Sequence, residues 1–108
     1  MRESEIQREC LVYLGTRLDL ATARTNTGAA IGKRGLVRFG IKGMADIHCL
    51  QAPHGRLVAI EVKTRTGRQS KDQIRYERMI RKFGGVYICT HSVANLHEQL
   101  ERELRCDQ

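Results

Sequence analysis

Residues 46–63, Asp-Ile-His-Cys-Leu-Gln-Ala-Pro-His-Gly-Arg-Leu-Val-Ala-Ile-Glu-Val-Lys, decide how the rest of the chain is arranged. Between Gln51 and Arg56 lie Ala-Pro-His-Gly, and proline and glycine are typical of a four-residue hairpin turn. Such a turn pairs Gln51 with Arg56, and the same register places Asp46 opposite Glu61. Directly opposed residues of an antiparallel pair have Cβ atoms about 4.5–5.5 Å apart. The stretch therefore predicts a hairpin that holds two carboxylates close together.

The two faces of this hairpin differ in character, because alternate residues of a strand share one face. The first face is apolar and collects Ile47, Cys49, Val58, Ile60 and Val62. The second face carries Asp46, His48, Leu50, Leu57, Glu61 and Lys63. A slip by one residue would mix the two sets, so the coherent apolar face supports the register.

The second face carries the groups needed for metal-assisted chemistry. Two adjacent carboxylates repel each other unless one is protonated or a cation lies between them. Mg²⁺ binds one or two carboxylates together with water and phosphate oxygens, and it lowers the pKa of its bound water. Lys63 can orient that water and stabilise negative charge in the transition state. This pattern indicates phosphodiester hydrolysis, although Glu-x-Lys on a strand is also common as a surface salt bridge.

Composition favours an acidic partner. The chain has 108 residues, which suits a single domain, and carries 19 Lys and Arg against 12 Asp and Glu, a net charge of +7. Such an excess favours nucleic acid, with a merely solvated basic surface as the alternative. No apolar run approaches the ~20 residues that span a membrane, and the N-terminus does not resemble a signal peptide. We therefore expect a protein of the cytoplasm with no membrane partner.

The cysteines and histidines show no pattern of a metal site. The four cysteines are Cys10, Cys49, Cys89 and Cys106, and none forms a Cys-x-x-Cys pair. We expect reduced thiols, two or three of them in the core. His48 shares the face of the acidic pair, where it is either a plain polar residue or a ligand or acid–base group.

The flanking sequence predicts helices on both sides of the hairpin. A first helix is expected from Ser4, with Gln7 at the capping-box position. By the residues alone, Glu5 is either a helix N-terminal carboxylate or a group at the edge of the core-facing surface of this helix. A second is expected from Ser70 to about Gly84, with Gln73 completing its capping box. A third starts at Ser92, and its leucines face either the core or a partner.

Short strands are expected at 21–25, 36–39 and 86–90, and a flexible glycine-rich loop at 29–35. The order is helix, strands with the hairpin, helix, strand and helix, which is an α/β arrangement. Basic residues in loops beside the hairpin are candidates for binding phosphates, namely Arg24, Lys33, Arg34, Arg65 and Arg68.

Several of these segments, in this order, match one known family. They are Glu5, Asn26-Thr27-Gly28, Gly43-Met44-Ala45-Asp46, Ile60-Glu61-Val62-Lys63, and Ser70-Lys71 with Gln73. Across nearly its whole length the chain resembles a virus-type replication-repair nuclease domain of the PD-(D/E)xK superfamily. Ala45 stands where the superfamily name has proline, which leaves the ligands unchanged.

The resemblance implies a fold and a catalytic set. The fold would be one α/β domain over residues 1–108, with a restriction-endonuclease-like core and a mixed central sheet flanked by helices, in the order α-β-β-β-α-β-α. Asp46, Glu61 and Lys63 would be catalytic, with Gln73 as an accessory residue. The metal would be Mg²⁺, with Mn²⁺ as a substitute. Its implied ligands are Asp46, Glu61, the Val62 carbonyl and Glu5.

The resemblance also implies a biological role. Small stand-alone members of phages are homodimers that cut branched DNA such as Holliday junctions, in the cytoplasm of a bacterial or phage-infected cell. We therefore expect a structure-selective, metal-dependent DNA endonuclease. The alternatives are a nickase or flap nuclease of the same chemistry, and a non-catalytic basic DNA-binding module whose acidic pair is structural.

Overall fold

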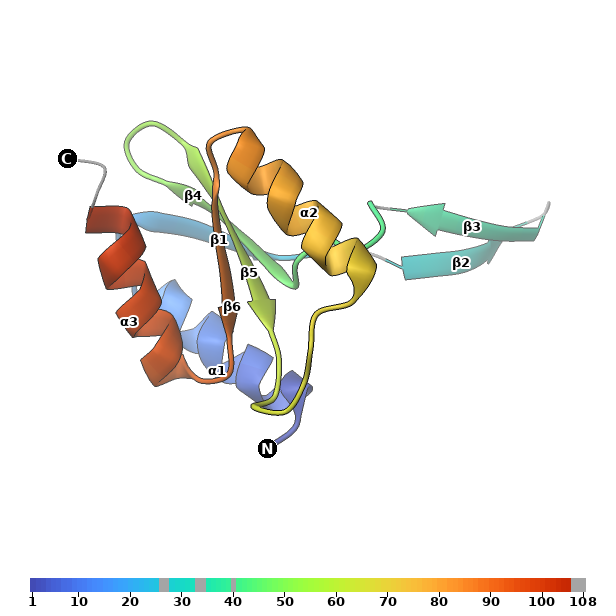
Figure 1. Cartoon of the computed structure of the whole chain (residues 1–108), viewed down its shortest axis with the longest axis horizontal. Coiled ribbons are helices and arrows are strands. Elements are labelled where there is room, and N and C mark those ends of the chain that lie inside the picture. The colour runs from blue at the N-terminus through green and yellow to red at the C-terminus, as the bar shows by residue number, and fades with distance from the viewer. Residues whose placement is uncertain (26–27, 33–34, 40, 106–108) are drawn as a thin grey trace.

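The computed structural model describes residues 1–25, 28–32, 35–39 and 41–105. Within these ranges the chain forms three helices and six strands (Figure 1). In chain order they are α1 (Glu3–Gly15), β1 (Leu20–Arg24), β2 (Gly28–Gly32), β3 (Gly35–Phe39), β4 (Ile47–Gln51), β5 (Arg56–Val62), α2 (Lys71–Lys82), β6 (Val86–Thr90) and α3 (Val93–Leu104).

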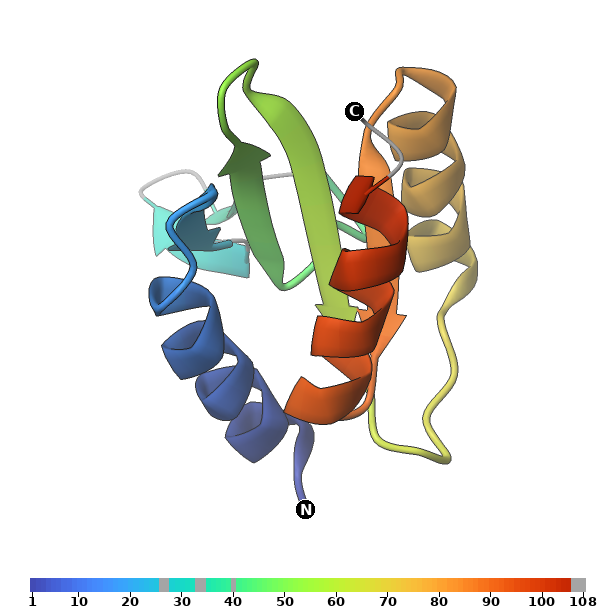
Figure 2. The same ribbon diagram turned by 90° about the vertical axis from the view of Figure 1, so that its left-hand side faces the viewer.

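Four of the strands form a mixed sheet in the order β1-β4-β5-β6. The pairs β1–β4 and β4–β5 are antiparallel, whereas β5 and β6 are parallel and connected through α2. Helices α1 and α3 cover one face of the sheet and α2 covers the other (Figures 1 and 2). The helices and the strands of this sheet follow the predicted order α-β-β-β-α-β-α, so the expected α/β fold is confirmed.

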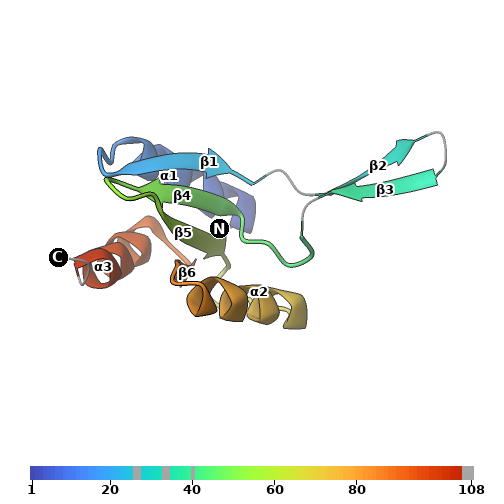
Figure 3. The same ribbon diagram turned by 90° about the horizontal axis from the view of Figure 1, so that it is seen from above.

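Strands β2 and β3 form a separate hairpin, which we call the arm. Its register runs from Gly28 opposite Phe39 to Gly32 opposite Gly35. Figures 1 and 3 show the arm extending away from the rest of the molecule. The predicted loop at 29–35 is wrong for residues 29–32 and for Gly35, because the pairing of β2 with β3 gives their backbone groups hydrogen-bond partners despite the glycines. Residues 33 and 34 of this prediction lie outside the described residues. The strand predicted at 36–39 is confirmed.

The central hairpin has the predicted register. Residues 52–55 form the turn, and Gln51 pairs with Arg56. The last pair of this register is Ile47 with Ile60, and one residue further along the same register places Asp46 opposite Glu61.

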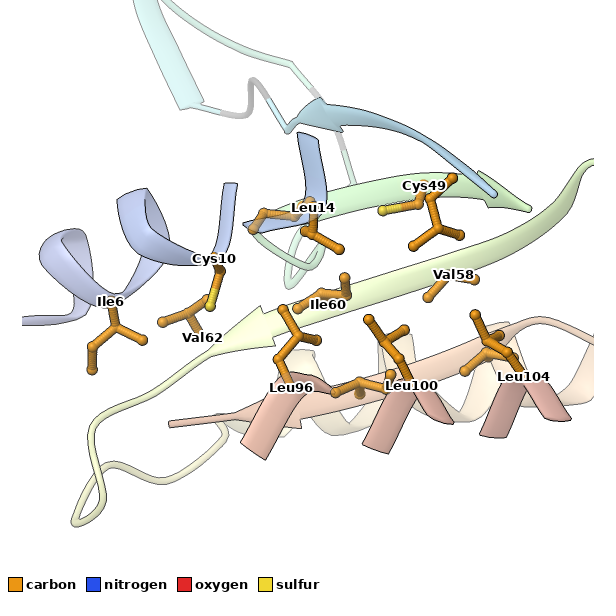
Figure 4. Close-up of a cluster of buried hydrophobic side chains, with 14 residues drawn as sticks. Ile6, Cys10, Leu14, Cys49, Val58, Ile60, Val62, Leu96, Leu100 and Leu104 are labelled. Carbon is orange, nitrogen blue, oxygen red and sulfur yellow. The ribbon is translucent and has the colours of Figure 1, made fainter. Parts of the chain in front are cut away.

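The main core lies between the apolar face of the hairpin and the helices α1 and α3 (Figure 4). Its strand residues include the five predicted ones, and all five are buried. Helix α1 contributes Ile6, Cys10 and Leu14, and α3 contributes Leu96, Leu100 and Leu104. The leucines of α3 therefore pack in this core, which removes them as a candidate dimer surface. Cys10 and Cys49 are buried free thiols and Cys89 is half-buried, whereas Cys106 lies outside the described residues.

A second, smaller cluster packs beneath α2, on the face that carries the acidic pair. It comprises Ala45, Ala59, Tyr76, Ile80 and Tyr87. The second face of the hairpin is therefore partly covered, and the polar side chains on it are enclosed between the sheet and α2.

Of the three predicted helix starts, one is wrong and two are confirmed. Helix α1 begins at Glu3 with Arg2 as its N-cap, so the predicted start at Ser4 is wrong. The backbone N–H of Arg2 donates to Glu5 Oε1 at 3.4 Å, so Glu5, and not Gln7, occupies the capping-box position. The starts of α2 after Ser70 and of α3 after Ser92 are confirmed. None of the helices in the described ranges has the length and apolar character to cross a membrane.

Candidate active site

Glu61 lies at the centre of the candidate site, on the face of β5 that α2 covers, and only 2% of its surface is exposed. Its Oε2 accepts a hydrogen bond from Gln73 Nε2 at 2.9 Å and lies 3.5 Å from Lys63 Nζ. Its Oε1 is buried and has no hydrogen-bond partner among the described residues. A buried charged group is costly unless it is paired, so this oxygen is a vacant acceptor for a cation or a proton.

Asp46 is held beside Glu61 by two backbone contacts. Its Oδ2 accepts a hydrogen bond from the backbone N–H of Val62 at 2.8 Å, across the end of β5. Its own carbonyl accepts one from Thr25 at 2.8 Å, which continues the pairing of β1 with β4. The predicted pair of carboxylates is therefore brought together at the point where the arm joins the sheet.

Burial and the neighbouring charges change the acidity of Glu61. Desolvation by burial raises its pKa, the charge of Asp46 raises it further, and Lys63 opposes the shift, with the result that the pKa is about 7. Near neutral pH the carboxyl group therefore keeps a proton for much of the time. A divalent cation between the two carboxylates would replace that proton.

Gln73 connects the acidic pair to the start of α2. Its Oε1 accepts from the Ser70 backbone N–H at 2.8 Å, and the Ser70 hydroxyl accepts from the Gln73 N–H at 3.2 Å, which is the predicted capping box. The amide nitrogen of the same side chain is then left to donate to Glu61. One residue thus fixes both the first turn of the helix and a carboxylate oxygen of the site.

The loop before β4 brings Asp46 alongside α2 because Gly43 permits close packing. Gly43 has φ +85°, and a Cβ atom there would lie 2.4 Å from the backbone carbon and oxygen of Asp72. Lys42 Nζ lies 3.4 Å from Asp72 Oδ2 in the same region. A residue with a side chain at position 43 would push the first turn of α2, and with it Gln73, away from the strands.

His48 is fixed by two side chains. Its Nδ1 contacts the Thr25 hydroxyl, and its Nε2 lies 2.7 Å from the Tyr76 hydroxyl. Burial lowers the pKa of the ring. Because both ring nitrogens are engaged, His48 joins β1, β4 and α2, and we assign it no ligand or acid–base role. Tyr76 and Thr25 are members of this network that sequence reasoning missed, since nothing in the pattern placed them beside His48.

Glu5, the remaining implied ligand, caps the start of α1. It is exposed in the first turn of α1, and no hydrogen bond or ion pair in the described part of the chain joins it to Asp46, Glu61 or Lys63. The structure thus places Glu5 as a helix N-terminal carboxylate, one of the two roles expected from the residues alone.

The candidate phosphate-binding residues are only partly described. Arg24 is exposed at the end of β1, and Arg65 and Arg68 are exposed in the segment that leads from Lys63 to α2. Lys33 and Arg34 lie outside the described residues. The three described arginines are therefore accessible near the ends of the strands that carry the acidic pair.

Within the described ranges, no group of three or more His, Cys, Asp and Glu side chains could hold a metal ion. Cys89 pairs with Glu61 in the sheet register, but burial raises the pKa of its thiol, which disfavours thiolate ligation. A zinc site needs more such ligands, whereas two carboxylates with backbone, water and phosphate oxygens suffice for Mg²⁺.

Comparison with protein-family models, curated proteins and solved structures finds no match to this chain.

Proposed function

We propose that this protein is a divalent-metal-dependent DNA endonuclease, related to the virus-type replication-repair nucleases that its motifs resemble. The observation that carries the proposal is the buried Glu61, which interacts with a second carboxylate, Asp46, and with Lys63 and has one side-chain oxygen, Oε1, without a hydrogen-bond partner among the described residues. A structural salt bridge explains one oxygen of Glu61 but leaves the other without a partner. The net charge of +7 supports a polyanionic substrate.

The residues present fit a hard divalent cation. Asp46 and Glu61 would hold Mg²⁺, or Mn²⁺ in its place, together with the backbone carbonyl of Val62. When bound, the metal supplies Lewis-acid activation of the phosphate and of a water molecule. Glu5 is the further ligand that the resemblance implies, and its carboxylate accepts a hydrogen bond from the Arg2 backbone N–H at the start of α1.

The side chains around the carboxylates have distinct roles. Gln73 holds Glu61 Oε2 in position, which leaves Oε1 free for the cation. Lys63, whose ammonium is anchored by Glu61, orients the attacking water and stabilises the negative charge that develops on the phosphate. Arg24, Arg65 and Arg68, with Lys33 and Arg34, contact the DNA backbone.

The substrate we propose is branched DNA, with Holliday junctions first, cut by a homodimer. A four-way junction presents paired strands, and a two-fold dimer presents two equivalent sites to them. Light scattering at micromolar concentration tests this arrangement. We expect a dimer, and a monomer would argue for a nickase or flap nuclease instead.

A cleavage assay tests the chemistry. Junction, flap, duplex and single-stranded DNA are incubated with Mg²⁺ or Mn²⁺, and chelator should abolish cleavage. Asp46→Asn and Lys63→Ala should each reduce the rate by about a hundredfold or more. The matched controls Glu98→Gln and Lys82→Ala remove the same charges from exposed positions and should cut at the wild-type rate. Cleavage by Asp46→Asn and Lys63→Ala at the rate of these controls would show that the assigned site is wrong.

Metal binding is measured separately from activity. Calorimetric titration of Mn²⁺ should show one saturable event in the wild-type protein and none in Asp46→Asn, with Glu98→Gln as the control. Tight junction binding with neither metal binding nor cleavage would support the non-catalytic DNA-binding module.

A further inference from the structure

A cavity of about 580 Å³ lies at the carboxyl ends of the parallel strands β5 and β6, and its lining includes Thr64, the residue after Lys63. In Figure 1 the N-terminus of α1 and the segments that follow both strands meet at this end of the molecule. The cavity is lined by Met1, Ile6, Glu9, Thr64, Arg65, Thr66, His91 and Ser92. The ends of the strands are joined here by the Lys63 N–H, which donates to the Thr90 carbonyl at 2.9 Å.

The polar lining has more donors than acceptors. The guanidinium of Arg65 and the ring of His91 make no hydrogen bond or ion pair with any residue that the structure describes. Thr64, Thr66 and Ser92 add three hydroxyl groups, whereas Glu9 is the single carboxylate. Ser92 also caps α3, whose first turn has no acidic residue. The cavity therefore favours an anion whose oxygens accept several hydrogen bonds.

The position of the cavity indicates that the anion is a phosphate group of the nucleic acid. Thr64 directly follows Lys63, so the cavity begins one residue after the proposed catalytic lysine. A nucleic-acid strand whose phosphate lies at Lys63 carries further phosphates on either side of it. The planar fork of Arg65 suits the oxygens of a phosphate group.

We infer that this cavity binds a second phosphate group of the strand being cut, with Arg65 and His91 as the donors. The inference rests on the proposed nuclease function and specifies how that site holds its substrate. The phosphate is either an internal phosphodiester or a terminal phosphomonoester, and the two share the same oxygens.

The test measures DNA binding in the Asp46→Asn background with chelator, where cleavage does not contribute. Arg65→Gln should weaken binding about tenfold, the loss of one charge-assisted hydrogen bond, and His91→Gln should weaken it by a smaller factor, the loss of one hydrogen bond from the ring. Arg65→Gln should also reduce the slope of log affinity against log salt by about one. The matched controls Arg78→Gln and His54→Gln change exposed residues outside the cavity and should bind as the parent does.

Two DNA substrates distinguish the sources of the phosphate. Equal losses with 5′-phosphorylated and 5′-hydroxyl DNA support an internal phosphodiester, and a loss confined to the phosphorylated DNA supports a terminal group. Arg65→Gln and His91→Gln variants that bind both as tightly as the controls, with an unchanged salt slope, overturn the inference. If half-buried His91 does not tolerate substitution, exposed Arg65 alone decides.

The inference and the proposed function can fail separately. If Asp46→Asn cuts DNA normally while Arg65→Gln loses affinity, the phosphate cavity stands and the catalytic assignment falls. If Asp46→Asn is inactive while Arg65→Gln binds DNA normally, the catalytic assignment stands and the phosphate cavity falls.

Discussion

Glu61 makes the stability of the metal-free protein depend on pH. Its pKa is about 7 in the folded protein, against an ordinary value of 4.5. Between these values the folded state holds a proton that the unfolded state has lost. The free energy of unfolding therefore falls as the pH rises through this window.

Replacement by a neutral isostere should remove that dependence. In chelator, Glu61→Gln should be close to the wild type in stability at pH 4.5 and more stable at pH 8, by roughly 2–3 kcal/mol. Urea unfolding at both pH values measures the difference. Parallel stability profiles for the two proteins would contradict the assigned environment of Glu61.

Tyr76 offers a second test at the scale of one atom. Tyr76→Phe removes the hydroxyl that lies 2.7 Å from His48 Nε2 and leaves a half-buried ring nitrogen without its partner. We expect a loss of about 1–2 kcal/mol in urea unfolding. Tyr13→Phe is the comparison: the Tyr13 hydroxyl lies 2.7 Å from Nδ1 of the exposed His97, where water can replace this contact, and it also accepts a hydrogen bond from Arg17 Nη1 at 3.1 Å. An unchanged free energy of unfolding in Tyr76→Phe would contradict a buried role for the His48 network.

At the scale of elements, the contact between the loop before β4 and the first turn of α2 depends on Gly43. Gly43→Ala should destabilise the protein by more than the ~1 kcal/mol expected for strain at positive φ alone, because its Cβ would overlap the Asp72 backbone. It should also reduce cleavage, since Gln73 moves with that turn.

Gly55→Ala is the control for this prediction. Gly55 has φ +74°, and a Cβ there would meet nothing within 4 Å. Gly55→Ala should lose only the stability that strain at positive φ costs, and it should keep its cleavage activity. Similar unfolding free energies for the two variants would show that the close approach at Gly43 is unimportant.

The β4–β5 hairpin could be predicted because two independent signals agree on its register. The turn between Gln51 and Arg56 and the alternation of apolar residues each allow only one pairing. The start of α2 was equally clear, because Ser70 and Gln73 form a local capping box.

Other features depend on contacts between distant segments and could not be predicted. Strand β2 forms through pairing with β3, although its own residues include glycines that are typical of loops. Tyr76 covers the sheet face that carries the acidic pair. Polar residues such as Asp, His, Glu and Lys on one face of a strand are typical of a face exposed to solvent, so the strand sequence does not indicate this cover. The cavity at the ends of β5 and β6 combines Arg65 with His91, which are 26 residues apart in the sequence (91 − 65).

At the scale of the whole molecule, the arm is joined to the body where Thr25 and Asp46 are hydrogen-bonded. Residues 24–42 contain five basic residues and no acidic one. The arm has its own two-stranded sheet, and Figure 3 shows it reaching beyond the body on the side where this connection lies. The charge of this segment and its point of attachment favour contact with DNA that lies at the acidic pair.

Replacement of residues 28–39 by a short Gly-Ser linker should separate stability from binding. The four-stranded sheet remains, so circular dichroism and the unfolding midpoint should change little. The variant loses Lys33, Arg34 and Arg38, and its DNA affinity should fall, with a salt slope lower by up to about three. Unchanged DNA binding would exclude the arm from the interface.

The shared use of Gln73 limits how this site can change or be transferred. A glutamate at this position would still complete a capping box, yet it would set a third carboxylate against Glu61. We therefore expect substitutions at Ser70, Gln73 and Glu61 to occur together in related proteins. An engineer who grafts the acidic pair onto another scaffold would have to transplant the first turn of α2 along with the two strands.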